Sequence, residues 1–143
     1  EGVLYIVGPG TTTRAIAEEM GLEKTLLGVD AVLNRELVAR DASESQLLAL
    51  LEEHGKRQVR IVVTPIGGQG YLFGRGNQQI SPNVIEKVGR EQLVVVSTPE
   101  QLYALGSQPL LVDTGVRAVD EMLSGYLTVV TGYNDRAVRK LAC

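Results

Sequence analysis

The sequence has few of the residues that build disulfides, metal clusters or catalytic pairs. It contains one cysteine, one histidine and no tryptophan among 143 residues. A single thiol, Cys143, excludes a disulfide within the chain and favours a reducing compartment, so we predict a cytoplasmic protein. His54 precedes Gly55 where a helix is expected to end, and a cation there suits the helix dipole. The sequence shows no Ser/His/Asp or Cys/His arrangement and no metal-ligand cluster.

The sequence also lacks an excess of positive charge and long apolar runs. Lys and Arg number 14 against 17 Asp and Glu, a net charge of −3. Nucleic-acid binding needs a basic face, so we do not expect nucleic acid as a partner. No apolar run approaches the roughly 18 residues of a membrane span, so no membrane partner is expected either.

The length fits one domain over residues 1–143, and the hydrophobic fraction of 44% is enough for a real core. The chain opens on Glu1 and runs almost directly into an expected strand. We therefore expect a fragment of a longer protein. A second copy of the chain, in a homo-oligomer, is a candidate partner.

Short apolar runs alternate with capped helical segments along the chain. Strands are expected at 3–7, 25–29, 59–63, 93–96, 109–112 and 127–130, with 36–39 ambiguous. Helices are expected at 14–20, 47–54, 82–88, from 99 onward, 117–123 and 135–141. Strands that are apolar throughout, each followed by a helix, indicate a parallel sheet covered on both sides. The sequence predicts an α/β fold, a Rossmann-like parallel sheet of about six strands with helices on both faces.

Small, hydroxylated or carboxylated residues follow each expected strand, where open parallel sheets bind ligands. These segments are Gly8–Thr13, Gly28–Asp30, Thr64–Gly68, Ser97–Thr98, Asp113–Gly115 and Thr131–Tyr133. A sheet with only a structural task does not need such residues at all six ends. The pattern favours a hydroxyl-rich, phosphate-bearing ligand such as a nucleotide or a sugar phosphate.

The first candidate anion loop is Gly8-Pro-Gly-Thr-Thr-Thr13. Gly8 and Gly10 allow a tight turn, and Thr11, Thr12 and Thr13 offer N–H groups and hydroxyls at a helix start. Asp30 lies twenty residues after Gly10, where a carboxylate can accept hydrogen bonds from ribose hydroxyls. The alternative is that Thr11 is a simple N-cap and Asp30 a solvated turn residue.

The second candidate anion loop is rich in glycine. Gly67, Gly68, Gly70, Gly74 and Gly76 fall within ten positions, and each glycine beyond those a turn needs costs roughly 0.5–1 kcal/mol of backbone entropy. No acidic residue occurs from Gly55 to Ile85, whereas Lys56, Arg57, Arg60 and Arg75 do. The stretch is suited to hold an anion with backbone N–H groups and Arg75, and Asn77 could contact an amide or a base edge. The alternative is a long surface loop.

Asp113 directly follows the expected strand at 109–112. It is a candidate for coordinating Mg²⁺ or for accepting a substrate hydroxyl, and equally a candidate for holding the turn into the next helix. With Asp30 it is one of two candidate catalytic carboxylates.

Five segments together resemble the C-terminal half of the predicted inorganic polyphosphate/ATP-NAD kinase family. They are Tyr5–Thr13, Thr25–Asp30, Ile61–Gly70, Phe73–Pro82 and Val112–Gly115, and the resemblance covers essentially the whole chain. It implies phosphorylation of NAD at the 2′-hydroxyl of the adenosine ribose, with ATP or polyphosphate as donor and a divalent metal such as Mg²⁺. The family's Gly-Gly-Asp-Gly-Thr motif does not occur in this sequence. The resemblance therefore implies a C-terminal fragment whose partner is the missing N-terminal domain of the same protein. We expect this part alone to bind weakly and to catalyse nothing.

A second, fainter likeness belongs to another functional class. The strand, the Gly8–Thr13 loop and the following Gly28–Asp30 segment are similar to ribose-5-phosphate isomerase and to sugar-phosphate sensor domains of repressors. That likeness implies that Thr11, Thr12 and Thr13 hold a sugar phosphate and that Asp30 acts on the sugar. A non-catalytic module that senses a nucleotide is a third reading.

Overall fold

The computed structural model describes residues 2–25, 28–54, 57–66, 69–74, 78–132 and 135–143. Within them the strands are β1 (Leu4–Val7), β2 (Asp30–Leu33), β3 (Glu36–Ala39), β4 (Val59–Val63), β5 (Tyr71–Phe73), β6 (Leu93–Val96), β7 (Leu110–Val112), β8 (Gly125–Gly132) and β9 (Asp135–Ala142). The helices are α1 (Thr11–Glu19), α2 (Glu44–Glu53), α3 (Pro82–Val88), α4 (Pro99–Leu105) and α5 (Arg117–Leu123), with a 3-10 turn at Arg90–Gln92.

These strands form one mixed sheet in the order β3-β2-β1-β4-β6-β8-β9-β7-β5. Parallel pairing joins β1 to β4, β4 to β6, β6 to β8, β7 to β9 and β5 to β7. Antiparallel pairing joins β1 to β2, β2 to β3 and β8 to β9. The predicted α/β class is confirmed, but the sheet is mixed rather than wholly parallel, and the described part has nine strands rather than about six.

Two predicted elements are wrong. A strand was expected at 25–29, but β2 begins at Asp30 and runs antiparallel to β1; residues 26 and 27 lie outside the described part. The tail was expected to be a helix, but it is β9, paired along β8. Ala137 and Leu141 face the core while Val138 is 61% exposed. Apolar residues four apart suit a strand as well as a helix, because four is also a multiple of the two-residue period of a strand.

The helix starts follow the local sequence. The hydroxyls of Ser43, Ser81 and Thr98 each accept a hydrogen bond from the backbone N–H three residues further on. Proline occupies the first turn of α3 and α4, where it costs no hydrogen bond. The predicted caps at Ser81 and Thr98, and the end of α3 at Gly89, are confirmed.

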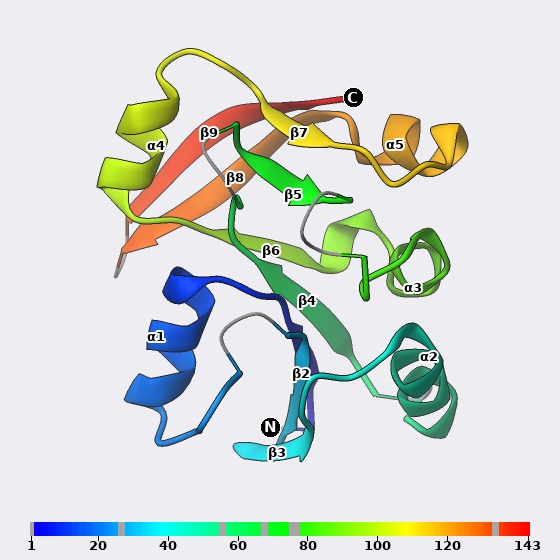
Figure 1. Ribbon diagram of the computed structural model, residues 1–143. Coiled ribbons are helices and arrows are strands. Elements are labelled where there is room, and N and C mark those ends of the chain that lie inside the picture. Colours follow the sequence, from blue (N-terminus) through cyan, green and yellow to red (C-terminus); the bar gives the residue numbers. More distant parts are fainter. Residues whose placement is uncertain (1, 26–27, 55–56, 67–68, 75–77, 133–134) are drawn as a thin grey trace.

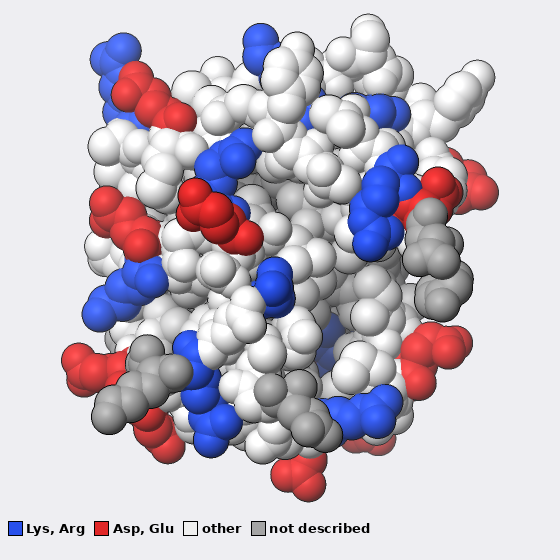
Figure 2. All heavy atoms as spheres, turned by 180° about the vertical axis from the view of Figure 1, so that it is seen from behind, with Lys and Arg blue, Asp and Glu red and all other residues white. Residues whose placement is uncertain are grey.

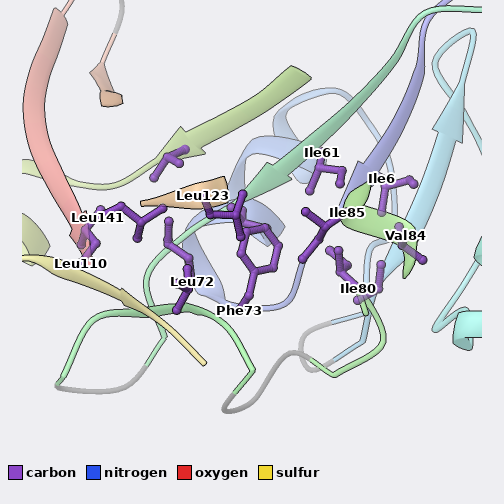
Figure 3. Packing of buried hydrophobic residues seen from close by; sticks show 14 of the residues in the cluster. Ile6, Ile61, Leu72, Phe73, Ile80, Val84, Ile85, Leu110, Leu123 and Leu141 are labelled. Carbon is purple, nitrogen blue, oxygen red and sulfur yellow. The ribbon is translucent and has the colours of Figure 1, made fainter. Parts of the chain in front are cut away.

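The helices lie on two sides of the sheet, α1 and α4 on one and α2, α3 and α5 on the other (Figure 1). Buried side chains from strands and helices converge in one core, in which Ile6, Ile61, Leu72, Phe73 and Leu110 meet Val84, Ile85 and Leu123 (Figure 3). Seen from behind, Lys and Arg are scattered among Asp and Glu (Figure 2). No described helix combines the length and the apolar character needed to cross a membrane.

Candidate functional site

The start of α1 directly follows β1. Gly10 is its N-cap, with φ 120°, and no side chain caps the helix. The first N–H groups of a helix have no partner inside the helix, so those of Thr11 and its neighbours are left for another acceptor. A Cβ on Gly10 would lie 2.8 Å from Cγ2 of Thr64, so glycine also lets the turn approach the end of β4.

The three threonines of the first loop have different surroundings. Thr13 is fully buried, and its hydroxyl lies 2.7 Å from the carbonyl oxygen of Gly8 and 3.2 Å from that of Gly10. Thr12 is half-buried, and its hydroxyl lies 3.4 Å from Oε1 of Gln101. Thr11 is exposed. Thr13 therefore holds the turn, and Thr11 and Thr12 are the members of the loop that can reach a ligand.

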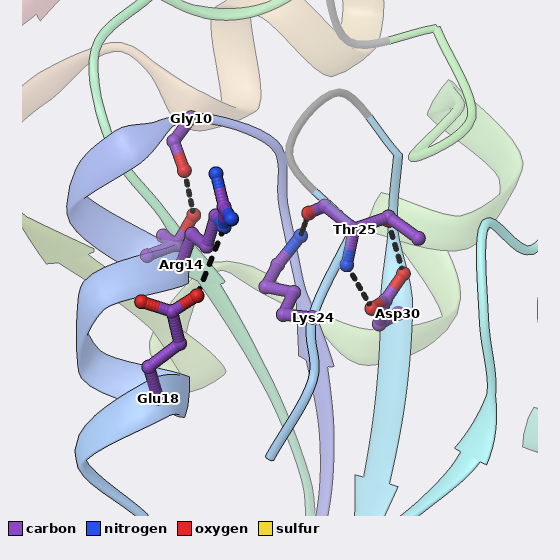
Figure 4. A network of polar contacts seen from close by, with 7 residues as sticks. Gly10, Arg14, Glu18, Lys24, Thr25 and Asp30 are labelled. Carbon is purple, nitrogen blue, oxygen red and sulfur yellow. Dashed lines mark hydrogen bonds and ion pairs between the residues drawn. The ribbon is translucent and has the colours of Figure 1, made fainter. Parts of the chain in front are cut away.

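Gly8 and Arg14 are also held by the protein itself. The N–H of Gly8 donates to the carbonyl oxygen of Val62 at 2.8 Å, which continues the ladder between β1 and β4. Arg14, one turn into α1, pairs with Glu18 at 3.1 Å (Figure 4). Anion binding at this loop would therefore use backbone N–H groups and hydroxyls more than the guanidinium of Arg14.

Gln101 of α4 joins the first loop to the residues that follow β4 and β6. Its Oε1 lies 3.4 Å from the hydroxyls of Thr12 and Thr64 and 3.1 Å from that of Ser97. Its Nε2 donates to the carbonyl oxygen of Pro65 at 2.8 Å. The sequence identified Thr64 and Ser97 only as strand-end residues, and Gln101 only as the third residue of a capped helix.

Asp30 is fully buried and its carboxylate is bound on both oxygens. It accepts from the N–H of Thr25 at 2.8 Å and from the hydroxyl of Thr25 at 2.6 Å (Figure 4). It also accepts from the N–H of Asp41 at 2.8 Å, so these bonds tie the segment before β2 to the segment after β3. The geometry gives Asp30 a structural task and leaves it closed to solvent.

Lys24 lies beside this carboxylate and is only 4% exposed. Its ammonium donates to the carbonyl oxygens of Thr25 at 2.9 Å and Gly28 at 2.8 Å. Burial lowers the pKa of Lys24, while the charges of Asp30 and Asp41 act in the opposite direction. The carbonyl oxygens solvate the ammonium in place of water.

Of the second candidate loop, Gly67, Gly68, Arg75, Gly76 and Asn77 lie outside the described residues. Gly70 has φ 83°, and its carbonyl oxygen accepts from the N–H of Leu111 at 3.0 Å. Gly74 has φ 95°, and a Cβ there would lie 1.9 Å from the carbonyl oxygen of Asp113. Gly70 and Gly74 therefore allow the backbone of this stretch to pack closely against β7 and against Asp113, which follows β7.

A cavity of about 270 Å³ opens where β5 and β7 end. It is lined by Gly74, Gln78, Ile80, Ser81, Pro82, Asp113 and Thr114. Asp113 is exposed, and it is the acidic residue of this lining. The structure thus brings the glycine-rich stretch and Asp113 together, which the sequence treated as separate features.

The turn after Asp113 is held by a different carboxylate. Asp120, in α5, accepts from the N–H of Thr114 at 3.0 Å and from its hydroxyl at 2.7 Å. No three His, Cys, Asp or Glu side chains come together as a metal site in the part of the chain that the structure describes.

No curated protein and no solved structure matches the chain. One protein-family model does, that of the ATP-NAD kinase C-terminal domain, and the match spans residues 1–141. The family predicted from the sequence motifs is confirmed. With nearly every residue inside this match, the chain belongs to the ATP-NAD kinase C-terminal domain family.

Proposed function

We propose that this chain is the C-terminal half of an NAD kinase, which transfers a phosphoryl group from ATP or polyphosphate to the 2′-hydroxyl of the adenosine ribose of NAD. The observation that carries the proposal is the family match over residues 1–141. The polar strand ends around Gln101 support it, because phosphoryl transfer depends mostly on positioning and on stabilising charge.

The start of α1 is the proposed phosphate site. Its free N–H groups and the positive end of its dipole favour an anion, and the hydroxyls of Thr11 and Thr12 lie beside them. Gly8, Gly10 and Thr13 shape this loop. The glycine-rich stretch would supply a second anion loop through Gly67, Gly68, Gly70, Arg75, Gly76 and Asn77.

Asp113, rather than Asp30, is the carboxylate we assign to ligand or metal. Asp113 lines a cavity, whereas both oxygens of Asp30 accept hydrogen bonds inside the protein. Mg²⁺ in nucleotide sites is commonly held by one or two carboxylates together with substrate phosphates, so one carboxylate fits such a site. The ion would neutralise phosphate charge, and Asp113 would hold it beside the glycine-rich stretch.

The remaining catalytic groups would come from an N-terminal part of the same protein, because the Gly-Gly-Asp-Gly-Thr motif does not occur in this sequence. In this proposal the partner of the domain is that part, and the cellular location is the cytoplasm, as the single cysteine suggests.

The direct test is an assay of the full-length protein for NADP formation, with ATP or polyphosphate as donor and with Mg²⁺ present or removed. We expect NADP to form and to need the metal. A thermal-shift series with NAD, ATP, polyphosphate and ribose 5-phosphate gives an independent result, since a ligand at about a hundred times its Kd stabilises a fold by about 2.7 kcal/mol. No NADP with any donor, together with binding of ribose 5-phosphate alone, would contradict the proposal and favour the isomerase-like class.

A further inference from the structure

Two helices of this domain begin with the same sequence signal and use it differently. Both α2 and α4 have a hydroxyl at the N-cap and a glutamine three residues later, Ser43 with Gln46 and Thr98 with Gln101. In α2 the amide oxygen of Gln46 accepts a hydrogen bond from the N–H of Ser43 at 2.8 Å, which completes a capping box. In α4 the backbone N–H of Gln101 donates to the hydroxyl of Thr98 at 3.0 Å, but the side chain of Gln101 turns away from the cap and donates to the carbonyl oxygen of Pro65.

The orientation of the Gln101 amide follows from its partners. The carbonyl oxygen of Pro65 can only accept, so the group 2.8 Å from it is the NH₂. The amide oxygen then faces the hydroxyls of Ser97, Thr12 and Thr64. These partners lie after β6, β1 and β4, so one side chain connects three strand ends.

The hydrogen bonds around this oxygen cannot all form at once. A carbonyl oxygen has two lone pairs, and each hydroxyl has one hydrogen to donate. At most two of the three hydroxyls therefore donate to Oε1 at a time. Thr64 and Ser97 are 2% and 3% exposed, whereas Thr12 is half-buried in the first turn of α1. The hydroxyl of Ser97 has a second acceptor in the carbonyl oxygen of Thr98 at 3.0 Å, but it is buried, so Thr12 is the hydroxyl that can turn toward a ligand.

We propose that Gln101 is a positioning residue of the phosphate site. It fixes the start of α1 against Thr64 and Pro65, where the chain enters the glycine-rich stretch, and it leaves the hydroxyl of Thr12 available to a phosphate or ribose oxygen. This inference rests on the proposed function. It adds that an amide of α4 holds the start of α1 and the segment after β4 in a fixed relative position.

The test compares Gln101→Ala with Gln46→Ala in the full-length protein. Both substitutions remove an amide at the third position of a capped helix, so Gln46→Ala controls for the loss of a local helix contact. Steady-state assays of NADP formation give KM for NAD, KM for the phosphoryl donor and kcat. We expect Gln101→Ala to raise KM for one phosphate-bearing substrate by roughly tenfold, with kcat changed less, and Gln46→Ala to match the wild type.

Gln101→Glu provides a readout that a merely structural role would not move. It keeps an oxygen facing the hydroxyls, loses the donor to the carbonyl oxygen of Pro65, and adds a negative charge near the proposed phosphate, so the dependence of KM on salt is the readout that isolates the charge. We expect a larger rise in KM than for Gln101→Ala, and a rise that salt reduces, because screening weakens the repulsion. Equal effects of Glu and Ala at all salt concentrations would overturn the placement beside a phosphate.

The outcomes separate this inference from the proposed function. Kinetic constants of Gln101→Ala equal to those of Gln46→Ala would overturn the role of Gln101 and leave the kinase assignment standing. If the wild type forms no NADP, the proposed function fails, and calorimetric titration with pyrophosphate then decides the role of Gln101. A Kd raised by Gln101→Ala but not by Gln46→Ala would support it; equal Kd values, or no binding by the wild type, would overturn it.

Discussion

Two polar regions lie beside each other at the ends of paired strands. Asp30 begins β2 and pairs with Val7, the last residue of β1, and the turn into α1 follows directly from Val7. Around Asp30 the polar groups are buried and bound to one another. At the start of α1 the helix has no side-chain cap. Both oxygens of the Asp30 carboxylate already accept hydrogen bonds inside the protein, whereas the first N–H groups of α1 can still donate to a ligand.

The difference between the two regions separates groups that stabilise the fold from groups that can bind a ligand. A buried and fully hydrogen-bonded carboxylate holds segments together, whereas a binding site needs donors whose partner comes from outside. With glycine as the N-cap, the lack of a capping side chain costs only about a few tenths of a kcal/mol, so the fold loses little by leaving the first N–H groups of α1 for a ligand. We therefore assign Asp30 to the fold and the start of α1 to the ligand.

Replacing Asp30 is the substitution expected to have the largest effect. Asp30→Ala leaves the N–H groups of Thr25 and Asp41 without their acceptor and removes a negative charge beside buried Lys24. We expect the free energy of unfolding to fall by about 3–5 kcal/mol in urea denaturation. The sequence offered Asp30 as a candidate ribose-binding or catalytic carboxylate, whereas its burial and its hydrogen bonds predict an effect on stability.

Asp113→Ala is the matched variant, because Asp113 is exposed at the cavity. We expect it to lose less stability than Asp30→Ala, because its side chain is exposed rather than buried, while NADP formation falls. Similar losses of stability in both variants would remove the contrast between the two carboxylates.

The glycines at the two ends of α1 separate an effect on ligand binding from an effect on stability within one helix. Gly10 and Gly21 both have positive φ, but a Cβ on Gly10 would meet Thr64 whereas one on Gly21 would meet nothing within 4 Å. Gly21→Ala should cost about 1 kcal/mol of stability from backbone strain alone and leave substrate KM unchanged. Gly10→Ala should cost about 2 kcal/mol and also raise KM, because Thr11 and Thr12 must shift. A wild-type KM for Gly10→Ala would show that the turn does not position the ligand.

The titration of Lys24 gives the smallest expected effect. Its pKa in the folded protein is lowered from 10.5, so between the lowered value and 10.5 the unfolded chain binds more protons than the folded one. Stability should therefore rise with pH in that alkaline range, relative to a Lys24→Met variant at each pH. The measurement is the free energy of unfolding of both proteins from neutral pH to about pH 10. A difference that is constant or falls with pH would contradict the burial of a charged Lys24.

The sequence predicted the elements that depend on residues near one another in the chain better than those that depend on pairing between distant segments. Helix starts at Ser81 and Thr98 were predicted because the caps and the prolines are local. The strand β5 was not predicted, because three residues become a strand only through pairing with β7. The tail was misassigned because its pairing with β8 decides between two periods that fit equally well.

The same limit applies to the site. The loop from Gly8 to Thr13 could be identified because its residues are consecutive and follow a strand. The closed surroundings of Asp30 could not be predicted, because one of its donors, Asp41, lies after β3 and reaches Asp30 only when β2 and β3 are paired. Gln101 was identified as part of a helix cap, yet its side chain bonds with residues 37 and 89 positions away. Those contacts exist only once β1, β4 and β6 are assembled.

The most direct test of the central claim is amide hydrogen exchange, measured by mass spectrometry on the full-length protein with and without saturating ATP or NAD. If phosphate binds at the start of α1, exchange in the peptide that contains Thr11, Thr12 and Thr13 should slow on ligand addition, while exchange around Asp30 should already be slow without ligand. Unchanged exchange at these threonines under conditions where ligand binds and slows exchange elsewhere would contradict the account.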